Sequence, residues 1–489
     1  MNKSDVTFEL VKVLTQNEKR YFRVFSNTRG NDKNYVRVFD ALDKMTTYDS
    51  KILNKKLAAY KINISYEKNY LYKQLLKMLR AFYTESSAVM ELQDTLKTIE
   101  ILYRKRLTAQ CQKLVDNGIG IAKKYELWNF HLELIEWQYR IYGRTGNYRK
   151  LSVYEAEGFS DKQRLTELIF AYAVIQKEIY SIVIISQGQG EYTTKETRAE
   201  IKNKMKSQLL LLKKYQNSFR ITDLLYSTLY LSAYFSGDMK GGYSYALKNY
   251  RLYEQHEHFK TESAFKFFVT ISNLTNRCIS LKKFDEGLIY ISEIKSFVKK
   301  LSSFASQDIQ QEQVSAIFGY ESRILLGTNC YAEALKAAKE FEQIRSPKNL
   351  RKNILLTDNV KLARVYFVNR LFRESLHLLS PVLNVNNEGV KLDFFIYSHL
   401  LRLCIHFELG NYDLLIHLAQ TAQRFFQKQN IEDDFAFAFI ELMKQVSRSD
   451  TVKKRKQIFT LNASPLKKLA KEPFEQYFEL SEWVENKVK

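Results

Sequence analysis

Along most of this chain, apolar residues recur at the three- and four-residue spacing that places them on one face of an α-helix. In the segment from about residue 66 to 83, for example, Leu71, Leu75 and Met78 share one side, together with Leu79 and Phe82. Segments of this kind follow one another from the N-terminus to the C-terminus. The pattern therefore predicts an all-α protein.

A short pattern repeats five times between residues 243 and 416: an aromatic residue, two variable positions, a mostly small residue, and then an aliphatic one. The copies lie 40 to 47 residues apart and begin at Tyr243, Phe284, Tyr331, Phe372 and Tyr412. Offsets 0, +3, +4, +7 and +10 are mostly apolar or small, as the second helix of a hairpin needs in order to bury one face. We interpret the aromatic residue as a packing residue.

A fixed period of this length is typical of stacked helix hairpins. We therefore predict a right-handed α-solenoid of helix hairpins with a period of about 41 residues and a helical N-terminal cap. Such folds usually bind partners and rarely catalyse reactions.

The N-terminal part predicts a separate small helical region. Thr15-Gln16-Asn17-Glu18 has the spacing of a capping box at the start of a helix. Gly30-Asn31-Asp32 interrupts that helix, and further helices are expected near 35–45, 50–60 and 66–83.

These patterns divide the chain into four predicted regions. Residues 1–88 form a helical cap domain, and residues 89–221 form degenerate hairpins with a long central helix pair at 162–217 around Gly188-Gln189-Gly190. Residues 222–430 form five TPR-like hairpins. Residues 431–489 form C-terminal capping helices, with the basic segment Lys453–Lys456 and a last helix near 472–487.

The term TPR-like rests on particular residues. Gly327 followed by Tyr331-Ala332-Glu333-Ala334-Leu335, and more loosely Gly410-Asn411-Tyr412, resemble tetratricopeptide (TPR) repeats, which end their first helix at a Gly and open the second with Tyr-x-x-Ala. The period is near 41 residues rather than the 34 of the standard repeat, and the glycine is missing before Phe284 and Phe372.

The layout of the whole chain carries a second resemblance. The start at Thr15-x-x-Glu18-Lys19-Arg20-Tyr21-Phe22 and the closing helix with Phe478 and Trp483 are similar to a group of uncharacterised bacterial TPR-like proteins. This resemblance covers the chain and implies no reaction.

The charge balance adds a class of partner. Lys and Arg number 76 against 54 Asp and Glu, a formal net charge of +22. Such an excess attracts RNA, DNA, ribosomes and acidic proteins alike. A lysine-rich solvated surface without a binding role gives the same composition.

Three groups of basic residues are candidates for binding an anionic partner. The first lies on one face of the second long central helix, the second in a loop after Pro347, and the third on the helix near 66–83, on the side away from its leucines. In that order they are Lys202, Lys206 and Lys213; Lys348, Arg351 and Lys352; and Lys73, Lys77 and Arg80.

The third group admits a more specific reading. A helix and a short turn precede it, as in a helix-turn-helix DNA reader. The turn Lys61-Ile62-Asn63-Ile64 lacks the usual glycine. In that reading the repeats behind it are a sensor or oligomerisation module.

Catalytic and metal-binding patterns are not found. The seven histidines do not converge at helical offsets from two segments, and His406 is interpreted as a core residue. Gly118-Ile119-Gly120 and Gly188-Gln189-Gly190 complete no phosphate-binding motif. We therefore expect no enzyme, and no catalytic, cofactor or metal site.

The cysteines and the apolar runs indicate in which cellular compartment the protein is expected. The four cysteines lie far apart with no C-x-x-C pair, which fits a reducing environment. No apolar run follows the N-terminus, and the run Ser181–Ile185 is much shorter than a bilayer span. We predict a cytoplasmic protein.

The sequence thus predicts a cytoplasmic, non-enzymatic scaffold that binds a protein or peptide partner. The alternative is a nucleic-acid-binding or ribosome-associated protein, including a regulator with helix-turn-helix-like DNA contacts. The sequence does not specify the oligomeric state.

Overall fold

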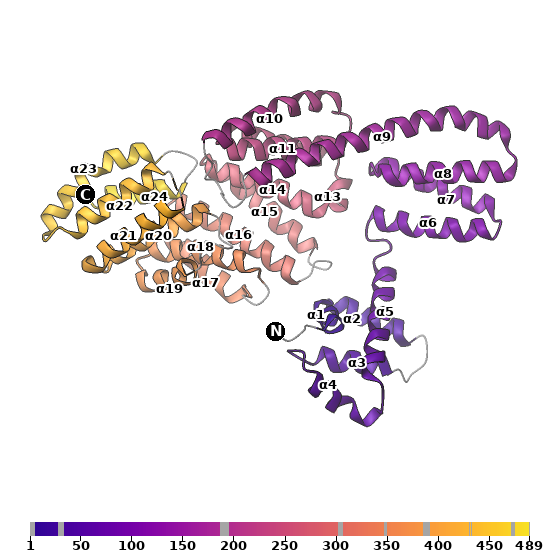
Figure 1. Ribbon diagram of the computed structural model, residues 1–489, viewed down its shortest axis with the longest axis horizontal. Helices are drawn as coiled ribbons and strands as arrows, with labels where there is room; N and C mark the ends of the chain where they lie inside the picture. Colours follow the sequence, from indigo (N-terminus) through magenta and orange to yellow (C-terminus); the bar gives the residue numbers. More distant parts are fainter. Residues whose placement is uncertain are drawn as a thin grey trace. The chain divides into compact units, whose positions relative to one another are not determined.

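The structure is a computed structural model of the chain (Figure 1). It describes residues 5–27, 34–185, 195–301, 307–346, 350–384, 392–429, 431, 433–470 and 475–488. Within these ranges helices account for 86% of the residues and no strand occurs, which confirms the all-α prediction. The chain divides into two compact units, residues 1–171 with 299–310 and residues 172–298 with 311–489.

The first unit begins with short helices around one apolar core, whose centre includes Val11, Phe22, Phe39, Leu71 and Leu75. These elements are α1 (Val6–Val13), α2 (Gln16–Asn27), α3 (Asn34–Asp43), α4 (Ser50–Leu57), the 3-10 turn η1 (Ala58–Tyr60) and α5 (Ile64–Phe82). The helices expected near 35–45, 50–60 and 66–83 are confirmed within a few residues, whereas α1 was not predicted. The break at Gly30-Asn31-Asp32 lies outside the described residues.

Longer helices follow: α6 (Ala88–Arg104), α7 (Thr108–Lys124), α8 (Trp128–Thr145), α9 (Tyr148–Ile185) and α10 (Lys195–Lys214). α6 packs on α7 and α7 on α8, around Leu92, Ile99, Val115 and Leu134. The predicted long central pair is confirmed as α9 and α10. α9 is longer than expected, with 38 residues, because it begins at Tyr148.

From there, helices follow one another to the C-terminus (Figure 1). They are α11 (Phe219–Ser236), α12 (Met239–Gln255), α13 (His258–Glu262), α14 (Ala264–Ser280), α15 (Phe284–Leu301), α16 (Gln307–Gly327), α17 (Tyr331–Ile344), α18 (Lys352–Val368), α19 (Phe372–Leu383), α20 (Leu392–Glu408), α21 (Tyr412–Lys428), α22 (Asp434–Ser447), α23 (Val452–Leu469) and α24 (Glu475–Asn486). Each helix from α17 to α24 packs against the next, and α20 also packs against α18 and α22.

The repeated aromatic residue marks the start of a helix in four of the five copies. Phe284, Tyr331, Phe372 and Tyr412 are the first residues of α15, α17, α19 and α21, whereas Tyr243 lies inside α12. The small or aliphatic residue three positions later is buried in every copy: Ala246, Gly287, Ala334, Ser375 and Leu415. The predicted stripe is wrong at Leu288, which is 48% exposed, because offset +4 lies at the edge of the buried face there.

Gly327 ends its helix, as the TPR resemblance implies, and it also makes room for an aromatic ring. It is the last residue of α16, and a Cβ atom on it would meet the Phe284 ring at 2.5 Å. Asn329, two residues later, takes the left-handed conformation that ends the helix, with φ +61°. Glycine at 327 therefore makes room for the repeated aromatic residue of the preceding hairpin.

The turns between helices share one backbone geometry. A left-handed residue stands two positions before each of α7, α8, α9, α12, α15, α17, α19 and α21: Arg106, Glu126, Gly146, Gly237, Lys282, Asn329, Arg370 and Gly410. In each turn the following amide bonds to the carbonyl five residues before it, as from Lys283 to Cys278 at 2.8 Å. This is the Schellman helix ending. The copies that lack a turn glycine therefore form the same turn.

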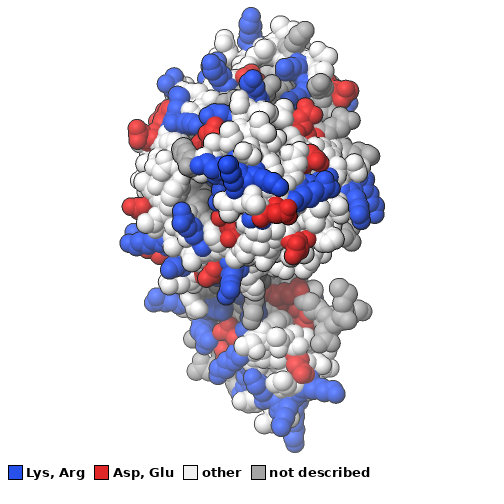
Figure 2. All heavy atoms as spheres, turned by 90° about the vertical axis from the view of Figure 1, so that its left-hand side faces the viewer, with Lys and Arg blue, Asp and Glu red and all other residues white. Residues whose placement is uncertain are grey.

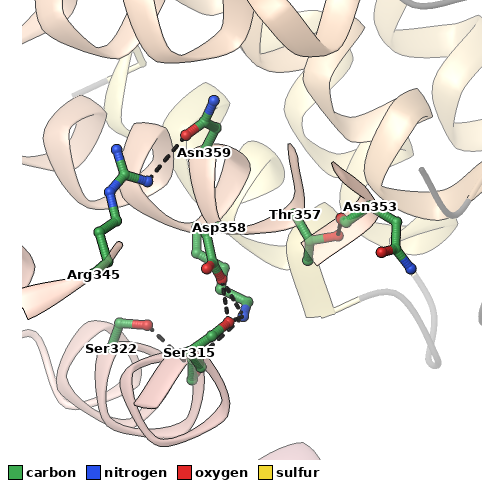
Figure 3. A network of polar contacts seen from close by, with 9 residues as sticks. Ser315, Ser322, Arg345, Asn353, Thr357, Asp358 and Asn359 are labelled. Carbon is green, nitrogen blue, oxygen red and sulfur yellow. Dashed lines mark hydrogen bonds and ion pairs between the residues drawn. The ribbon is translucent and has the colours of Figure 1, made fainter. Parts of the chain in front are cut away.

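A buried polar network joins α16 to α18 (Figure 3). The Ser315 hydroxyl donates to Asp358 Oδ1 at 2.5 Å, and Lys361 Nζ donates to the same oxygen at 2.9 Å and to the Ser315 carbonyl at 3.2 Å. Asp358 is fully buried. Gly319 lies beside Lys361, where a Cβ atom would be 3.1 Å from Cε. The lysine charge thus compensates a carboxylate that water does not reach.

The C-terminal helices close the second unit. The Trp483 ring lies near Phe407, Phe439 and Phe459, and its indole N–H donates to Glu408 at 2.7 Å. The basic segment Lys453–Lys456 forms the first turns of α23.

The turn geometry predicts that glycine stabilises the turns that lack it. Lys282→Gly and Arg370→Gly should each raise the free energy of unfolding by about 0.5–1 kcal/mol, because left-handed backbone is unfavourable for a side chain with a Cβ atom. Lys336→Gly, at an exposed position inside α17, is the matched control and should lower it by about 1 kcal/mol. Urea denaturation measures both; destabilisation by all three substitutions would contradict this account.

The buried network predicts a larger loss. Asp358→Ala should lower the free energy of unfolding by about 3 kcal/mol, because it leaves Lys361 without its carboxylate. Thr357→Ala, on the same helix, removes only a hydroxyl that bonds to the Asn353 carbonyl and should change stability by less than about 1 kcal/mol. Equal effects in the same urea titration would show that the network does not stabilise the packing of α16 on α18.

Candidate binding hollow on α5 and α6

Helix α5 has a buried face and a basic face. Its buried residues are Leu71, Leu75 and Met78. The three candidate cations of this helix, Lys73, Lys77 and Arg80, are exposed on the opposite side, as predicted. The helix begins at Asn63, whose side-chain oxygen accepts a hydrogen bond from the Tyr66 amide at 3.1 Å. This N-cap determines where the helix starts, and therefore where its basic face starts.

The first half of α5 is anchored to α1. Lys68 Nζ donates to the Asp5 carboxylate and, at 2.9 Å, to the Tyr48 hydroxyl. Asp5 also caps α1, since Oδ1 accepts from the amides of Thr7 at 3.0 Å and Phe8 at 3.1 Å. Burial alone raises the pKa of the Asp5 carboxyl, but Lys68 and the two amides outweigh it and lower the pKa below its ordinary 3.8.

The end of α5 is anchored to the start of α2. Glu18 accepts hydrogen bonds from the Thr15 amide at 2.6 Å and hydroxyl at 2.8 Å, while its own amide donates to that hydroxyl, so the predicted capping box is confirmed. The other carboxylate oxygen accepts from the Tyr83 hydroxyl at 2.7 Å. Burial and this bond to Glu18 raise the pKa of Tyr83. Tyr83 stays protonated and holds the end of α5 in place.

A hollow of about 580 Å³ lies where α5 ends and α6 begins. Its lining combines the basic face of α5 with apolar side chains: Lys73, Gln74, Leu76, Lys77, Leu79, Arg80, Tyr83 and Met90. Leu76 is 38% exposed and Met90 44% exposed. The structure therefore places all three α5 candidates around one apolar surface.

Sequence reasoning missed this apolar component. Leu76 lies three residues after Lys73 and four before Arg80, so helical spacing alone places it among the cations. Met90 belongs to the next helix and is brought in by the short connection after Tyr83. Ser87 starts that helix by accepting a hydrogen bond from the Met90 amide at 3.2 Å.

The cations of the hollow are not neutralised locally. Within the part of the chain that the structure describes, the side chains of Lys73, Lys77 and Arg80 form no ion pair with a carboxylate. The hollow can therefore hold negatively charged groups next to apolar ones. Figure 2 shows a face of the molecule on which Lys and Arg side chains are spread among Asp and Glu.

The α10 group is only partly described. Lys202 and Lys213 are exposed on this helix, and the side chain of Lys206 lies outside the described residues. Leu209 on the same helix is 40% exposed. The buried Gln208 faces the core instead, where the Ser232 hydroxyl contacts its side-chain oxygen at 3.5 Å.

The loop group is partly neutralised. Lys348 lies outside the described residues. Arg351 forms a two-bond pair with Glu312 at 2.6 and 2.9 Å, so its charge is compensated within the chain. Lys352 is exposed at the first position of α18. By contrast, all three members of the α5 group are described and line one hollow together.

The geometry of α5 bears on the helix-turn-helix reading. Lys61, with φ +50°, supplies the left-handed residue of the turn despite the missing glycine. Helix-turn-helix proteins read bases mainly with the N-terminal residues of the second helix. Here Lys68 in that half is bonded to Asp5, and the unpaired cations follow later. This arrangement disfavours base readout by α5.

The histidines of α20 pack in the interior. The ring of His399 stacks on Phe425 at 5.4 Å, and burial together with Arg402 lowers its pKa to about 3. His406 Nδ1 lies 3.2 Å from Nδ2 of the Asn411 side chain. His406 is buried, as the sequence indicated. No cluster of three or more His, Cys, Asp or Glu side chains that could hold a metal ion is found among the described residues.

One helix of the described residues, α9, contains an 18-residue window long and apolar enough to cross a membrane, with a mean hydropathy of 1.7. A single window of this kind is weak evidence, because core helices meet the same criterion. Only 17% of the window is buried. In the sequence, Lys177 and Glu178 lie between the apolar runs 168–175 and Ser181–Ile185 of this helix, and each run alone is much shorter than a bilayer span.

The anchor of α5 predicts a pH dependence. A carboxyl whose pKa is lower in the folded state stabilises the fold above its unfolded pKa, and this contribution disappears as the pH falls through the folded value. Asp5→Asn should therefore lower the free energy of unfolding by about 1 kcal/mol at pH 7. The difference should shrink below the ordinary carboxyl pKa of 3.8.

Asp49→Asn provides the control. Asp49 caps α4 through the amides of Lys51 and Ile52, without a bonded cation among the described residues. It should change stability less at pH 7 than Asp5→Asn. Urea titrations at several pH values measure both, and a loss at Asp5 that does not change with pH would contradict the ion pair.

No protein-family model matches the sequence, and a search of curated proteins finds no significant match.

Proposed function

We propose that this protein is a non-enzymatic scaffold that binds an acidic segment of a protein partner in the cytoplasm. In this proposal the helices from α11 onward form TPR-like hairpins stacked into a right-handed solenoid. Four helices beginning at the repeated aromatic residue, and the shared turn geometry, support the repeat. The packing of α18, α20 and α22 on one another supports the stacking.

The observation that carries the proposal is the lining of the α5–α6 hollow. Three exposed cations stand beside exposed Leu76 and Met90. An amphipathic segment with carboxylates next to leucine- or phenylalanine-like residues satisfies both components. Burying two apolar side chains contributes about 2–4 kcal/mol that does not depend on salt, and the ion pairs add orientation and a faster association.

Nucleic-acid or ribosome binding is the second candidate. The net charge of +22 and the exposed Lys202 and Lys213 on α10 favour it. A phosphate backbone uses cations but gains little from exposed leucine or methionine side chains. The apolar lining of the hollow therefore favours a protein segment over a nucleic acid at this site.

Two double variants separate these functions on the full-length protein. The probes are a synthetic acidic amphipathic peptide and an RNA oligonucleotide, both fluorescently labelled. Leu76→Ser with Met90→Ser should weaken peptide binding at least about tenfold, through lost apolar contact, and leave RNA binding unchanged. Lys73→Glu with Lys77→Glu should weaken the binding of both probes.

A salt titration and a matched control variant complete this binding test. Val452→Ser, at an exposed apolar position on α23, should behave as wild type. Peptide binding should persist at moderate salt, whereas RNA affinity falls with a log–log slope of about −0.7 per neutralised phosphate. RNA binding that exceeds peptide binding and does not depend on Leu76 and Met90 would overturn the proposal.

A further inference from the structure

The C-terminal half of α9 exposes an apolar face where a surface helix is normally polar. Ile175 and Ile182 are buried within the second unit. On the opposite side, one stripe at helical spacing consists of Ala173, Lys177, Tyr180 and Ile184, which we call the α9 stripe. Tyr180 is 60% exposed and Ile184 is 67% exposed.

The surface at the α9 stripe is hollowed as well as apolar. It borders a shallow hollow of about 490 Å³, together with Gln176, Ser181 and Ile185. From Ala173 to Ile184 the helix rises about 17 Å, at 1.5 Å per residue, so the stripe matches three turns of a partner helix. Exposed apolar surface of this kind usually marks a place where another molecule binds.

The charges of the stripe restrict the molecule that binds. Lys177 is exposed at its centre. The acid nearest in sequence, Glu178, points to the other side of the helix and pairs with Lys204 at 3.3 Å. Among the described residues no carboxylate pairs with Lys177, so a partner that covers Tyr180 and Ile184 must also meet its ammonium group, for which a carboxylate is the natural complement.

This charge argues against a second copy of the chain. A twofold interface places the same patch against itself. Two copies of Lys177 would then approach each other, between two chains that each carry a formal charge of +22. The stripe of one copy offers no carboxylate to the other.

It also argues against a lipid surface. A spanning helix would have to release Ile175 and Ile182 from the second unit and place Lys177 and Glu178 inside the hydrocarbon. Helices that lie in the membrane interface carry their cations on the polar face, at the edge of the apolar one. Lys177 instead lies in the middle of the apolar stripe.

We propose that the α9 stripe docks an amphipathic helix of a partner protein, with apolar residues at i, i+3, i+4 and i+7 and one carboxylate facing Lys177. It is a second surface, separate from the α5–α6 hollow. The two surfaces differ in chemistry, because the hollow presents three cations and the stripe presents one.

A display library tests the proposal on the full-length protein carrying Lys73→Glu and Lys77→Glu. In this reference protein the α5–α6 hollow no longer attracts acidic peptides, so it does not contribute to the selection. The library holds amphipathic helical peptides with fixed leucines on one face and one central position that varies among Asp, Glu, Lys, Arg, Gln and Ala. The reference protein should enrich Asp and Glu at that position at least about tenfold over Lys and Arg. Lys177→Glu should reverse the preference, which loss of folding could not do.

Further variants locate the binding. Added to the reference protein, Tyr180→Ser with Ile184→Ser should abolish enrichment, and Leu461→Ser, at an exposed apolar position on α23, should leave it unchanged. Wild type, which keeps the α5–α6 hollow, is selected in parallel. Acidic enrichment by wild type alone would show that the hollow binds and the stripe does not, whereas enrichment by the reference protein that Tyr180→Ser with Ile184→Ser abolishes would show that the stripe binds.

Three results would overturn the proposal. The first is that no peptide is enriched more strongly than by the variant with Tyr180→Ser and Ile184→Ser, or that the preference for Asp and Glu at the central position survives Lys177→Glu. The second is sedimentation of wild type with phosphatidylserine-containing vesicles that the same double variant removes, which would assign the stripe to a lipid surface. The third is a wild-type dimer that this double variant dissociates, which would assign it to self-association.

Discussion

The burial of each helix by its neighbours in the sequence is the constraint on which this structure depends. α20 shows it most clearly, because its buried residues lie all around the helix and include Phe395, Ile396, Leu400, Leu401 and Cys404. A single hairpin partner covers only one side of such a helix. α18, α19, α21 and α22 all pack against it. The stability of one hairpin therefore depends on the next.

The packing of each helix against its neighbours also explains where a buried polar side chain and the turns between helices are placed. Inside the stack, Asp358 is kept only with Ser315 and Lys361 bonded to it. Between helices, a short turn with one left-handed residue recurs and fixes the separation of successive helices. A helical stack built this way has rigid helix faces. A face that no neighbour covers is then available for a partner without rearrangement of the core.

Two such faces stand out, on α5 with α6 and on α9. Each combines exposed cations with exposed apolar side chains, Lys73 and Lys77 with Leu76 in one case and Lys177 with Tyr180 and Ile184 in the other. Acidic, partly apolar protein segments fit this combination better than phosphate backbones do. In the proposed function, the high net charge speeds association with an acidic partner and disfavours basic ones.

The sequence predicted the helices well, because their periodicity reports one buried face directly. It identified Thr15 and Glu18 as a cap and Lys73, Lys77 and Arg80 as one face. It placed a helix end at Gly327, but only the fold shows that the Phe284 ring lies against this glycine. It could not reveal the neutralisation of Arg351 by Glu312, 39 residues away, or the approach of Met90 to Leu76. Such contacts depend on how helices pack, which periodicity does not specify.

The heat-capacity change on binding an acidic amphipathic peptide to the full-length protein tests the central claim most directly. Calorimetry at several temperatures should give a clearly negative value, because binding removes Leu76 and Met90 from water. A value near zero for a bound peptide would show that the site recognises charge alone and would contradict the account.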